Sequence, residues 1–242
     1  MPGPQQERPA SGQGSGPQPF EVDEMDESTD PSKPGQVAGG PIEAVVFDVG
    51  RVLFQWDLRH LYAPLIADPA ELDWFLANVV TERWHFQHDQ GRPVAEMLAE
   101  RQAEFPGHAE LITVWAERFN DSIPGPVPGS FALVEALHAR GVPLYAITNF
   151  GAEFWANFRP HHPIFDRFRE IVVSGEERIA KPDPRIYRLA EARFGRAPGT
   201  MLFIDDNAAN ITAVRQCGWH GHVFTDALTL ERDLRARGLL PD

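Results

Sequence analysis

The chain has 242 residues, of which 43% are hydrophobic, enough to bury the core of one large domain or of one domain with an insert. Its formal net charge of −13 argues against nucleic acids and anionic membranes as partners, because both bind basic patches. The single cysteine, Cys217, excludes an internal disulfide framework and is typical of a reducing compartment. With no apolar stretch typical of a membrane span or signal peptide, we expect a soluble, cytoplasmic protein, whose oligomeric state the sequence leaves unknown.

Residues 1–40 differ in composition from the rest of the chain. They are dominated by Pro, Gly, Gln and Ser, followed by an acidic patch, and they carry a net charge of −5, which leaves −8 for the remainder. Since they contain almost nothing apolar to bury, they are expected to form a disordered tail. A regulatory or partner-binding role for this tail is the less favoured alternative.

From Ile42 onward, short apolar runs rich in β-formers alternate with amphipathic stretches of helical length. Strands are expected at 42–47, 143–147, 171–173, 201–204 and 221–224. Helices are expected at 130–140, 184–194 and 207–217, each followed or closed by a glycine that ends it. This alternation predicts an α/β fold with a doubly wound, parallel, Rossmann-like sheet.

Residues 57–125 interrupt the alternation, because their pattern predicts helices only. Asp68-Pro69 is a typical helix start and leads into a helix at 70–80, and further helices are expected at 93–105 and 108–120. We therefore expect an α/β core formed by residues 41–56 and 126–242. The helical segment 57–125 would be a cap over the carboxyl edge of the sheet.

Two of the expected strands run directly into acidic residues. Asp48 follows the first strand, and Asp205 and Asp206 follow the strand at 201–204. The carboxyl ends of parallel strands meet at the edge of a sheet where ligands bind. Three carboxylates in one cleft repel each other unless a cation lies between them, and an all-oxygen set suits Mg²⁺. The sequence therefore predicts a magnesium site around a nucleophilic Asp.

Four motifs stand in a fixed order: Asp48, then Thr148-Asn149, then Lys181-Pro182, then Asp205-Asp206 with Asn210 four residues later. In this order the chain resembles the haloacid dehalogenase superfamily, in the subgroup with a helical cap after the first strand. The run Phe47–Leu53, the cap run Phe86–Gly91 and the run Lys181–Tyr187 further resemble the bacterial glucose-1-phosphate phosphatase branch and the phosphatase domain of soluble epoxide hydrolases.

The resemblance implies a phosphatase that acts on a small phosphorylated metabolite, with a sugar phosphate favoured. Asp48 would be the nucleophile and would form an aspartyl-phosphate that water hydrolyses. Asp48, Asp206 and the backbone carbonyl of Gly50 would hold Mg²⁺, which relieves the repulsion between the carboxylate and the phosphate dianion. Lys181 would add a second positive charge on the phosphoryl oxygens.

Four further residues receive supporting roles from the same resemblance. The Thr148 hydroxyl and the backbone N–H of Asn149 would bind the phosphoryl oxygens. Asp205 would orient Lys181 or a metal-bound water, and Asn210 would support the last motif from behind.

The chain departs from the superfamily at Gly50. Most phosphatases of this kind carry an Asp two residues after the nucleophile as general acid and base, and a positioned proton donor accelerates a reaction by about 10²–10⁴-fold. A cap residue (His85, His88 or Asp89) or a leaving group of low pKa would compensate. His85 and His88 are otherwise expected to be partly exposed structural residues.

Two alternative functions remain open. A 2-haloacid dehalogenase uses the same Asp nucleophile without a metal, but such enzymes carry uncharged residues where Asp205-Asp206 stands here and a bulky residue in place of Gly50. A catalytically weak protein that keeps the fold as a binding or regulatory module is the other alternative, which Gly50 and the acidic tail motivate.

Overall fold

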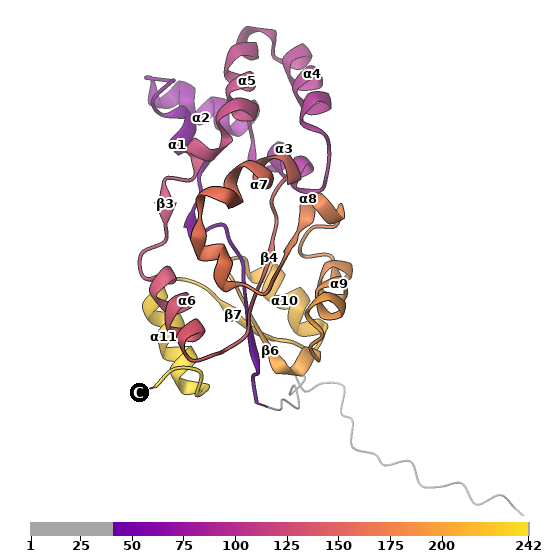
Figure 1. Cartoon of the computed structure of the whole chain (residues 1–242). Coiled ribbons are helices and arrows are strands. Elements are labelled where there is room, and N and C mark those ends of the chain that lie inside the picture. The colour runs from indigo at the N-terminus through magenta and orange to yellow at the C-terminus, as the bar shows by residue number, and fades with distance from the viewer. Residues whose placement is uncertain (1–40, 242) are drawn as a thin grey trace, which may run out of the picture. The chain divides into compact units, whose positions relative to one another are not determined.

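A five-stranded parallel sheet forms the centre of the computed structural model, which describes residues 41–241. The strand order is β5-β4-β1-β6-β7 (Figure 1). The strands are β1 (Ala44–Phe47), β4 (Leu144–Thr148), β5 (Glu170–Val173), β6 (Met201–Asp205) and β7 (His220–Val223). Each lies within two residues of its expected position, and the predicted α/β class with a parallel sheet is confirmed. The tail expected at 1–40 lies outside the described residues.

Both faces of the sheet are covered by helices. Successive side chains of a strand point to opposite faces, so each strand contributes to two apolar clusters. In β1, Val45 and Phe47 belong to one apolar cluster, whereas Ala44 and Val46 belong to another. The first cluster contains residues of α6 (Ser130–Ala139) and α11 (Ala227–Ala236), and the second contains residues of α9 (Pro184–Phe194) and α10 (Ala208–Gln216). This double coverage explains why the strands read as continuous apolar runs.

The three helices expected in the core appear at nearly the expected residues. Asp183 accepts a hydrogen bond from the Arg185 backbone N–H at the start of α9, and Gly195 ends that helix with a left-handed φ of 61°. Three core helices were not expected, namely α7 (Ala152–Phe158) and α8 (Ser174–Glu177), which follow β4 and β5, and α11, which follows β7. Single 3₁₀ turns occupy η3 (Arg159–His161), η4 (Pro163–Arg167) and η5 (Pro198–Thr200).

Residues 57–125 contain five α-helices. They are α1 (Leu58–Tyr62), α2 (Pro69–Asn78), α3 (Glu82–Asp89), α4 (Val94–Glu104) and α5 (Ala109–Arg118), with 3₁₀ turns η1 (Pro106–His108) and η2 (Phe119–Ser122). We call residues 57–125 the cap segment. Its helices gather at the end of the molecule where the parallel strands terminate (Figure 1).

A short two-stranded ribbon joins the cap segment to the sheet. β2 (Phe54–Gln55) pairs antiparallel with β3 (Gly125–Pro126), so the chain enters and leaves the cap segment side by side. The sequence does not predict this ribbon, because two residues are too few to show a strand pattern.

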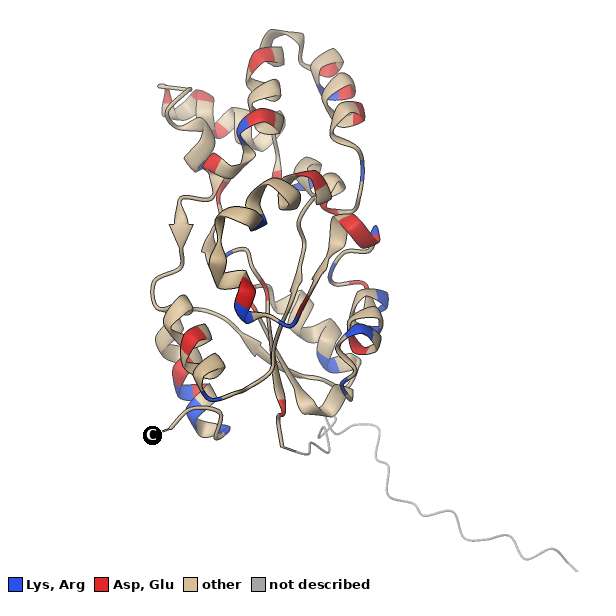
Figure 2. Cartoon of the chain, in the orientation of Figure 1, with Lys and Arg blue, Asp and Glu red and all other residues tan. Residues whose placement is uncertain are grey.

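Charged residues lie mainly on the helices and loops, while the strands are almost free of them (Figure 2). Asp205, at the end of β6, is a buried exception. None of the helices in residues 41–241 is both long and apolar enough to cross a membrane.

Candidate active site

The sheet register brings the acidic motif residues to one place. β1 lies between β4 and β6, and Phe47 pairs with Ala146 on one side and with Ile204 on the other. One residue further along, the backbone N–H of Asp48 donates to the Ile204 carbonyl at 2.8 Å. Asp48 therefore leaves the sheet next to the end of β6, where Asp205 stands.

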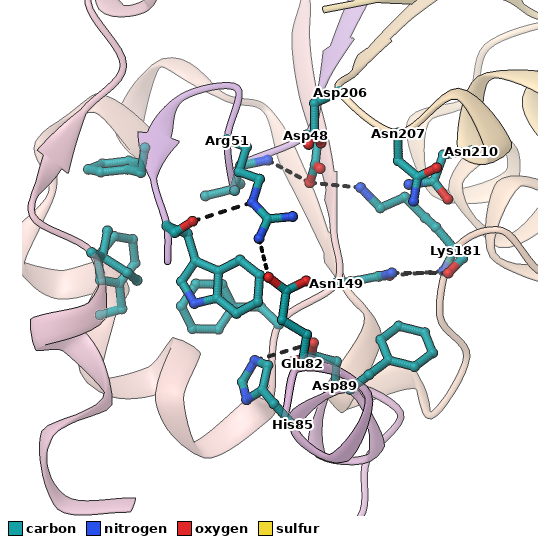
Figure 3. Close-up of a pocket in the computed structure, with 18 of the residues that line it drawn as sticks. Asp48, Arg51, Glu82, His85, Asp89, Asn149, Lys181, Asp206, Asn207 and Asn210 are labelled. Atoms are coloured by element: carbon teal, nitrogen blue, oxygen red, sulfur yellow. Dashed lines mark hydrogen bonds and ion pairs between the residues drawn. The ribbon is translucent and has the colours of Figure 1, made fainter. Parts of the chain in front are cut away.

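A buried lysine links the two acidic motifs. Lys181 is only 1% exposed, and its Nζ lies 2.7 Å from Asp48 Oδ1 and 2.8 Å from Asp205 Oδ2 (Figure 3). Burial alone lowers the pKa of Lys181, but Asp205 and Asp48 outweigh burial and raise this pKa above its ordinary value. The ammonium therefore keeps its charge in the site.

Asp205 is fully engaged by hydrogen bonds from its neighbours. Its Oδ1 accepts from the Asn207 backbone N–H at 2.8 Å and from the Asn210 side chain at 3.0 Å. Its Oδ2 accepts from Lys181 at 2.8 Å and from Asn210 at 2.9 Å. In this arrangement Asp205 orients Lys181, and Asn210 holds Asp205 in place.

The carboxylates of Asp48, Asp205 and Asp206 form a cluster in which one oxygen from each lies within 4.8 Å of the others. Burial raises the pKa of Asp48 to about 8; Lys181 opposes this rise, and Asp205 and Asp206 add to it. Burial, followed by the charge of Asp205, also raises the pKa of Asp206. The single ammonium of Lys181 does not neutralise three carboxylates. All three can therefore be ionised together only if a further cation binds.

These residues fit a divalent cation such as Mg²⁺. The donor set consists of oxygens, and the cluster lacks the His and Cys ligands that favour zinc. Because both oxygens of Asp205 are already engaged, Asp48 and Asp206 are the carboxylates left to hold the ion. Gly50 lines the same cavity, as the predicted backbone ligand should.

Thr148 and Asn149 are placed differently from each other. The side chain of Asn149 exchanges two hydrogen bonds with the backbone of Lys181, accepting at 2.9 Å and donating at 3.0 Å, so it positions the lysine. Asn149 lines the cavity, whereas Thr148 is not among the lining residues. The Thr148 hydroxyl is buried and has no hydrogen-bond partner within residues 41–241.

Sequence reasoning missed an ion pair that joins the first motif to the cap segment. Arg51, three residues after Asp48, lies 2.5 Å from Glu82 Oε1 at the start of α3 (Figure 3). Its guanidinium also lies over the Trp56 ring, 4.7 Å from the centroid. No sequence pattern pairs residues 31 positions apart, so only the fold reveals this contact.

The expectation for His85 and His88 is wrong with respect to exposure. Both are buried, at 3% and 2% exposed, because α3 packs its histidine face against aromatic residues of α5 and α7. His85 lines the cavity beside Asp89, and His88 instead contacts the Arg92 carbonyl at 2.9 Å through Nδ1.

The motif residues open onto a cavity of about 440 Å³ between the sheet edge and the cap segment. One part of its wall is polar and contains Asp48, Lys181 and Asp206 (Figure 3). Another part is aromatic and is contributed by both the core and the cap segment, namely Phe54, Trp56, Phe86, Phe119, Phe150 and Phe158.

The chain is similar to several known proteins. The model of the haloacid dehalogenase-like hydrolase family matches residues 42–218. The sesquiterpene phosphatase astK of Aspergillus oryzae is 26% identical over 196 residues, which cover 80% of this chain and 95% of that protein. Phosphoglycolate phosphatase of Escherichia coli K12 is 29% identical over 103 residues, which cover 40% and 41% of the two chains.

A similar solved structure is that of a HAD family enzyme from Bacteroides thetaiotaomicron, in complex with magnesium and inorganic phosphate. It superposes with a TM-score of 0.57 at 19% identity, covering 76% of this chain and 95% of that one. At this identity the likeness concerns the fold alone.

The fold, the site and these relatives define a phosphatase-type hydrolase. The chain belongs to the haloacid dehalogenase-like hydrolase family, since the family model covers most of its length. The narrower likeness to glucose-1-phosphate phosphatases and epoxide hydrolase domains stays a prediction.

Proposed function

We propose that this chain is a Mg²⁺-dependent phosphomonoester hydrolase in which Asp48 attacks the phosphoryl group and forms an aspartyl-phosphate. One observation carries the proposal: Asp48 is held against a buried ammonium, in a cluster whose three carboxylates converge within 4.8 Å. A carboxylate can approach a phosphate dianion only where neighbouring positive charges offset the repulsion between the two anions.

The side chains divide the work. Lys181 fixes one oxygen of Asp48, and its charge faces the incoming phosphoryl oxygens. Asn149, which lines the cavity, offers its backbone N–H as a further donor for that group, whereas the buried Thr148 hydroxyl does not line the cavity. Asp48, Asp206 and the Gly50 carbonyl would hold Mg²⁺, which would supply positive charge for the phosphoryl oxygens. The Bacteroides enzyme, solved in complex with magnesium and inorganic phosphate, supports a magnesium-dependent reaction on a phosphoryl group.

The two alternatives fit the site less well. A dehalogenase needs no metal ion. In such an enzyme Asp206, which lines the cavity beside Asp48, would be a second carboxylate whose charge no metal ion offsets. A purely regulatory module needs no ionised Lys181 buried between two carboxylates, an arrangement that is costly without a function to retain it.

The substrate itself is a further proposal. The sequence resemblance favours a sugar phosphate, but the aromatic part of the cavity wall favours an apolar group. Sugar hydroxyls against phenyl rings lose hydrogen bonds to water without replacement. An apolar group instead gains about 25 cal/mol for each Å² removed from water. We therefore favour a phosphomonoester with an apolar moiety over a sugar phosphate, and the sesquiterpene phosphatase relative supports this choice.

Phosphate release with and without Mg²⁺ tests the reaction. The parent should release phosphate with Mg²⁺ and lose this activity in EDTA, and Asp48→Asn should be inactive. Asp226→Asn is the matched control, because Asp226 only caps α11 and should leave the rate unchanged. Halide release from 2-chloropropionate that survives EDTA would instead support a dehalogenase.

A matched pair of esters tests the substrate class. Hexyl phosphate should be hydrolysed with a higher kcat/KM than glucose 1-phosphate. Phe86→Ala, which trims the cavity wall, should lower kcat/KM for hexyl phosphate by about tenfold while leaving glycerol phosphate nearly unchanged. Trp74→Ala is the control, since Trp74 is 46% exposed and lies outside the cavity. A preference for glucose 1-phosphate would return the assignment to sugar phosphates.

A further inference from the structure

Phosphate ester cleavage needs a proton for the leaving oxygen unless that oxygen is already a good anion. In this chain Gly50 occupies the position where related phosphatases place the acid. Gly50 has no side chain that could donate a proton. Asp48 and Asp205 contact Lys181, and Asp206 is assigned to the metal ion together with Asp48. A proton donor must therefore come from elsewhere on the cavity wall.

Asp89, the last residue of α3, is placed for this task. It is 5% exposed, lines the same cavity as Asp48 and Lys181, and comes from the cap segment on the opposite side (Figure 3). Its Oδ1 is buried and has no hydrogen-bond partner within residues 41–241. A buried carboxyl oxygen without a partner is costly, which points to a role in the reaction.

A chain of contacts from α5 positions the Asp89 carboxyl. The indole N–H of Trp115 donates to His85 Nδ1 at 3.1 Å. Because an indole N–H can only donate, Nδ1 must accept, and the ring proton of neutral His85 stands on Nε2. That Nε2 faces Asp89 Oδ2 at 3.5 Å. This contact holds the Asp89 carboxyl in place through its Oδ2.

We propose that Asp89 is the general acid of this enzyme, supplied by the cap segment in place of the missing acid at Gly50, with His85 and Trp115 as positioning residues. The proposal rests on the phosphatase function proposed above. The carboxyl of Asp89, which lines the cavity, would donate its proton to the oxygen of the leaving group.

The charges around Asp89 agree with a protonated carboxyl. Burial raises the pKa of Asp89 well above its ordinary value; the nearby Gly151 backbone N–H and Lys181 oppose this rise, and Asp48 adds to it. Burial, with His88 adding to it, lowers the pKa of His85 to about 3, so His85 offers no positive charge that would ionise Asp89 at neutral pH.

The balanced reaction uses this proton twice. In the first step an oxygen of Asp48 bonds to phosphorus, the bond to the leaving oxygen breaks, and that oxygen takes the proton of Asp89 and departs as an alcohol. In the second step the Asp89 carboxylate takes a proton from water as the water oxygen bonds to phosphorus. The bond to Asp48 then breaks, phosphate is released and Asp89 is protonated again.

Two esters that differ in leaving group test the proposal. In Asp89→Asn, kcat/KM for hexyl phosphate should fall by about 10²–10⁴-fold. For p-nitrophenyl phosphate, whose leaving group needs no proton, the loss should be much smaller, and this retained activity also shows that the variant is folded. Equal losses for both esters would show a structural role and overturn the proposal, as would no loss for either.

The parent protein provides a second measurement that does not depend on a variant. As pH rises through the pKa of Asp89, the rate with hexyl phosphate should fall relative to the rate with p-nitrophenyl phosphate, because only the first needs the proton. A ratio independent of pH would overturn the proposal. If the parent hydrolyses neither ester with Mg²⁺, the proposed function itself fails, which is a different result from either outcome for Asp89.

Discussion

Replacing Lys181 by Met keeps most of the side-chain volume and removes the charge between Asp48 and Asp205. Both carboxylates stay buried, and each loses its contact with Lys181 Nζ, at 2.7 Å for Asp48 and 2.8 Å for Asp205. Breaking a buried ion pair by removing one partner costs about 3–5 kcal/mol. For a domain of this size, such a loss lowers Tm by about 6–20 °C.

Urea unfolding of the metal-free protein in EDTA measures this loss without a cation to replace the ammonium. The control is Arg167→Met, which removes an exposed cation from its contact with Glu135. Because both of these side chains are at least 40% exposed, that change should cost at most about 1 kcal/mol. If the Lys181 variant were as stable as the control, Lys181 would not compensate the buried carboxylates, and the electrostatic account of the site would be wrong.

Three further results are expected. Asp206→Asn should abolish the rise in Tm that Mg²⁺ causes in the parent; an unchanged rise would place the ion elsewhere. Since the pKa of Asp48 is raised from 3.8 to about 8, the folded metal-free protein binds more protons than the unfolded chain between these values and loses stability as pH rises through them. Mg²⁺ binds the ionised carboxylate, so it should raise Tm more at about pH 8 than at about pH 5, and equal shifts would contradict this. Glu82→Gln, which breaks the half-exposed pair with Arg51, should change the free energy of unfolding by less than about 1 kcal/mol; a larger loss measured in urea would show that this contact fastens the cap segment.

The parts of the fold that the sequence predicts well are those with a local pattern. The helix at 184–194 has its apolar face, its Asp183 cap and its closing Gly195 within a dozen residues, and it appears at those residues. The strands before Asp48 and Asp205 are similarly marked by continuous apolar runs. Since parallel strands end at one edge, the sequence predicts that the acidic motifs share that edge, and the pairing of β1 with β6 brings them into contact.

The parts that the sequence does not predict depend on distant packing. Arg51 meets Glu82 because the cap segment lies over the sheet edge, and Trp115 meets His85 because α5 packs on α3 within the cap segment. The burial of His85 has the same origin: its helix is polar on average, and its aromatic neighbours come from separate elements.

The central claim is that Asp48 accepts the phosphoryl group in the presence of a divalent cation. Rapid acid quenching during turnover of p-nitrophenyl phosphate, followed by peptide mass spectrometry, tests it directly. The account predicts a phosphoryl group on the peptide at Asp48, present with Mg²⁺ and lost in EDTA. Steady turnover with an unmodified Asp48 peptide, or a phosphoryl group on another residue, would contradict it.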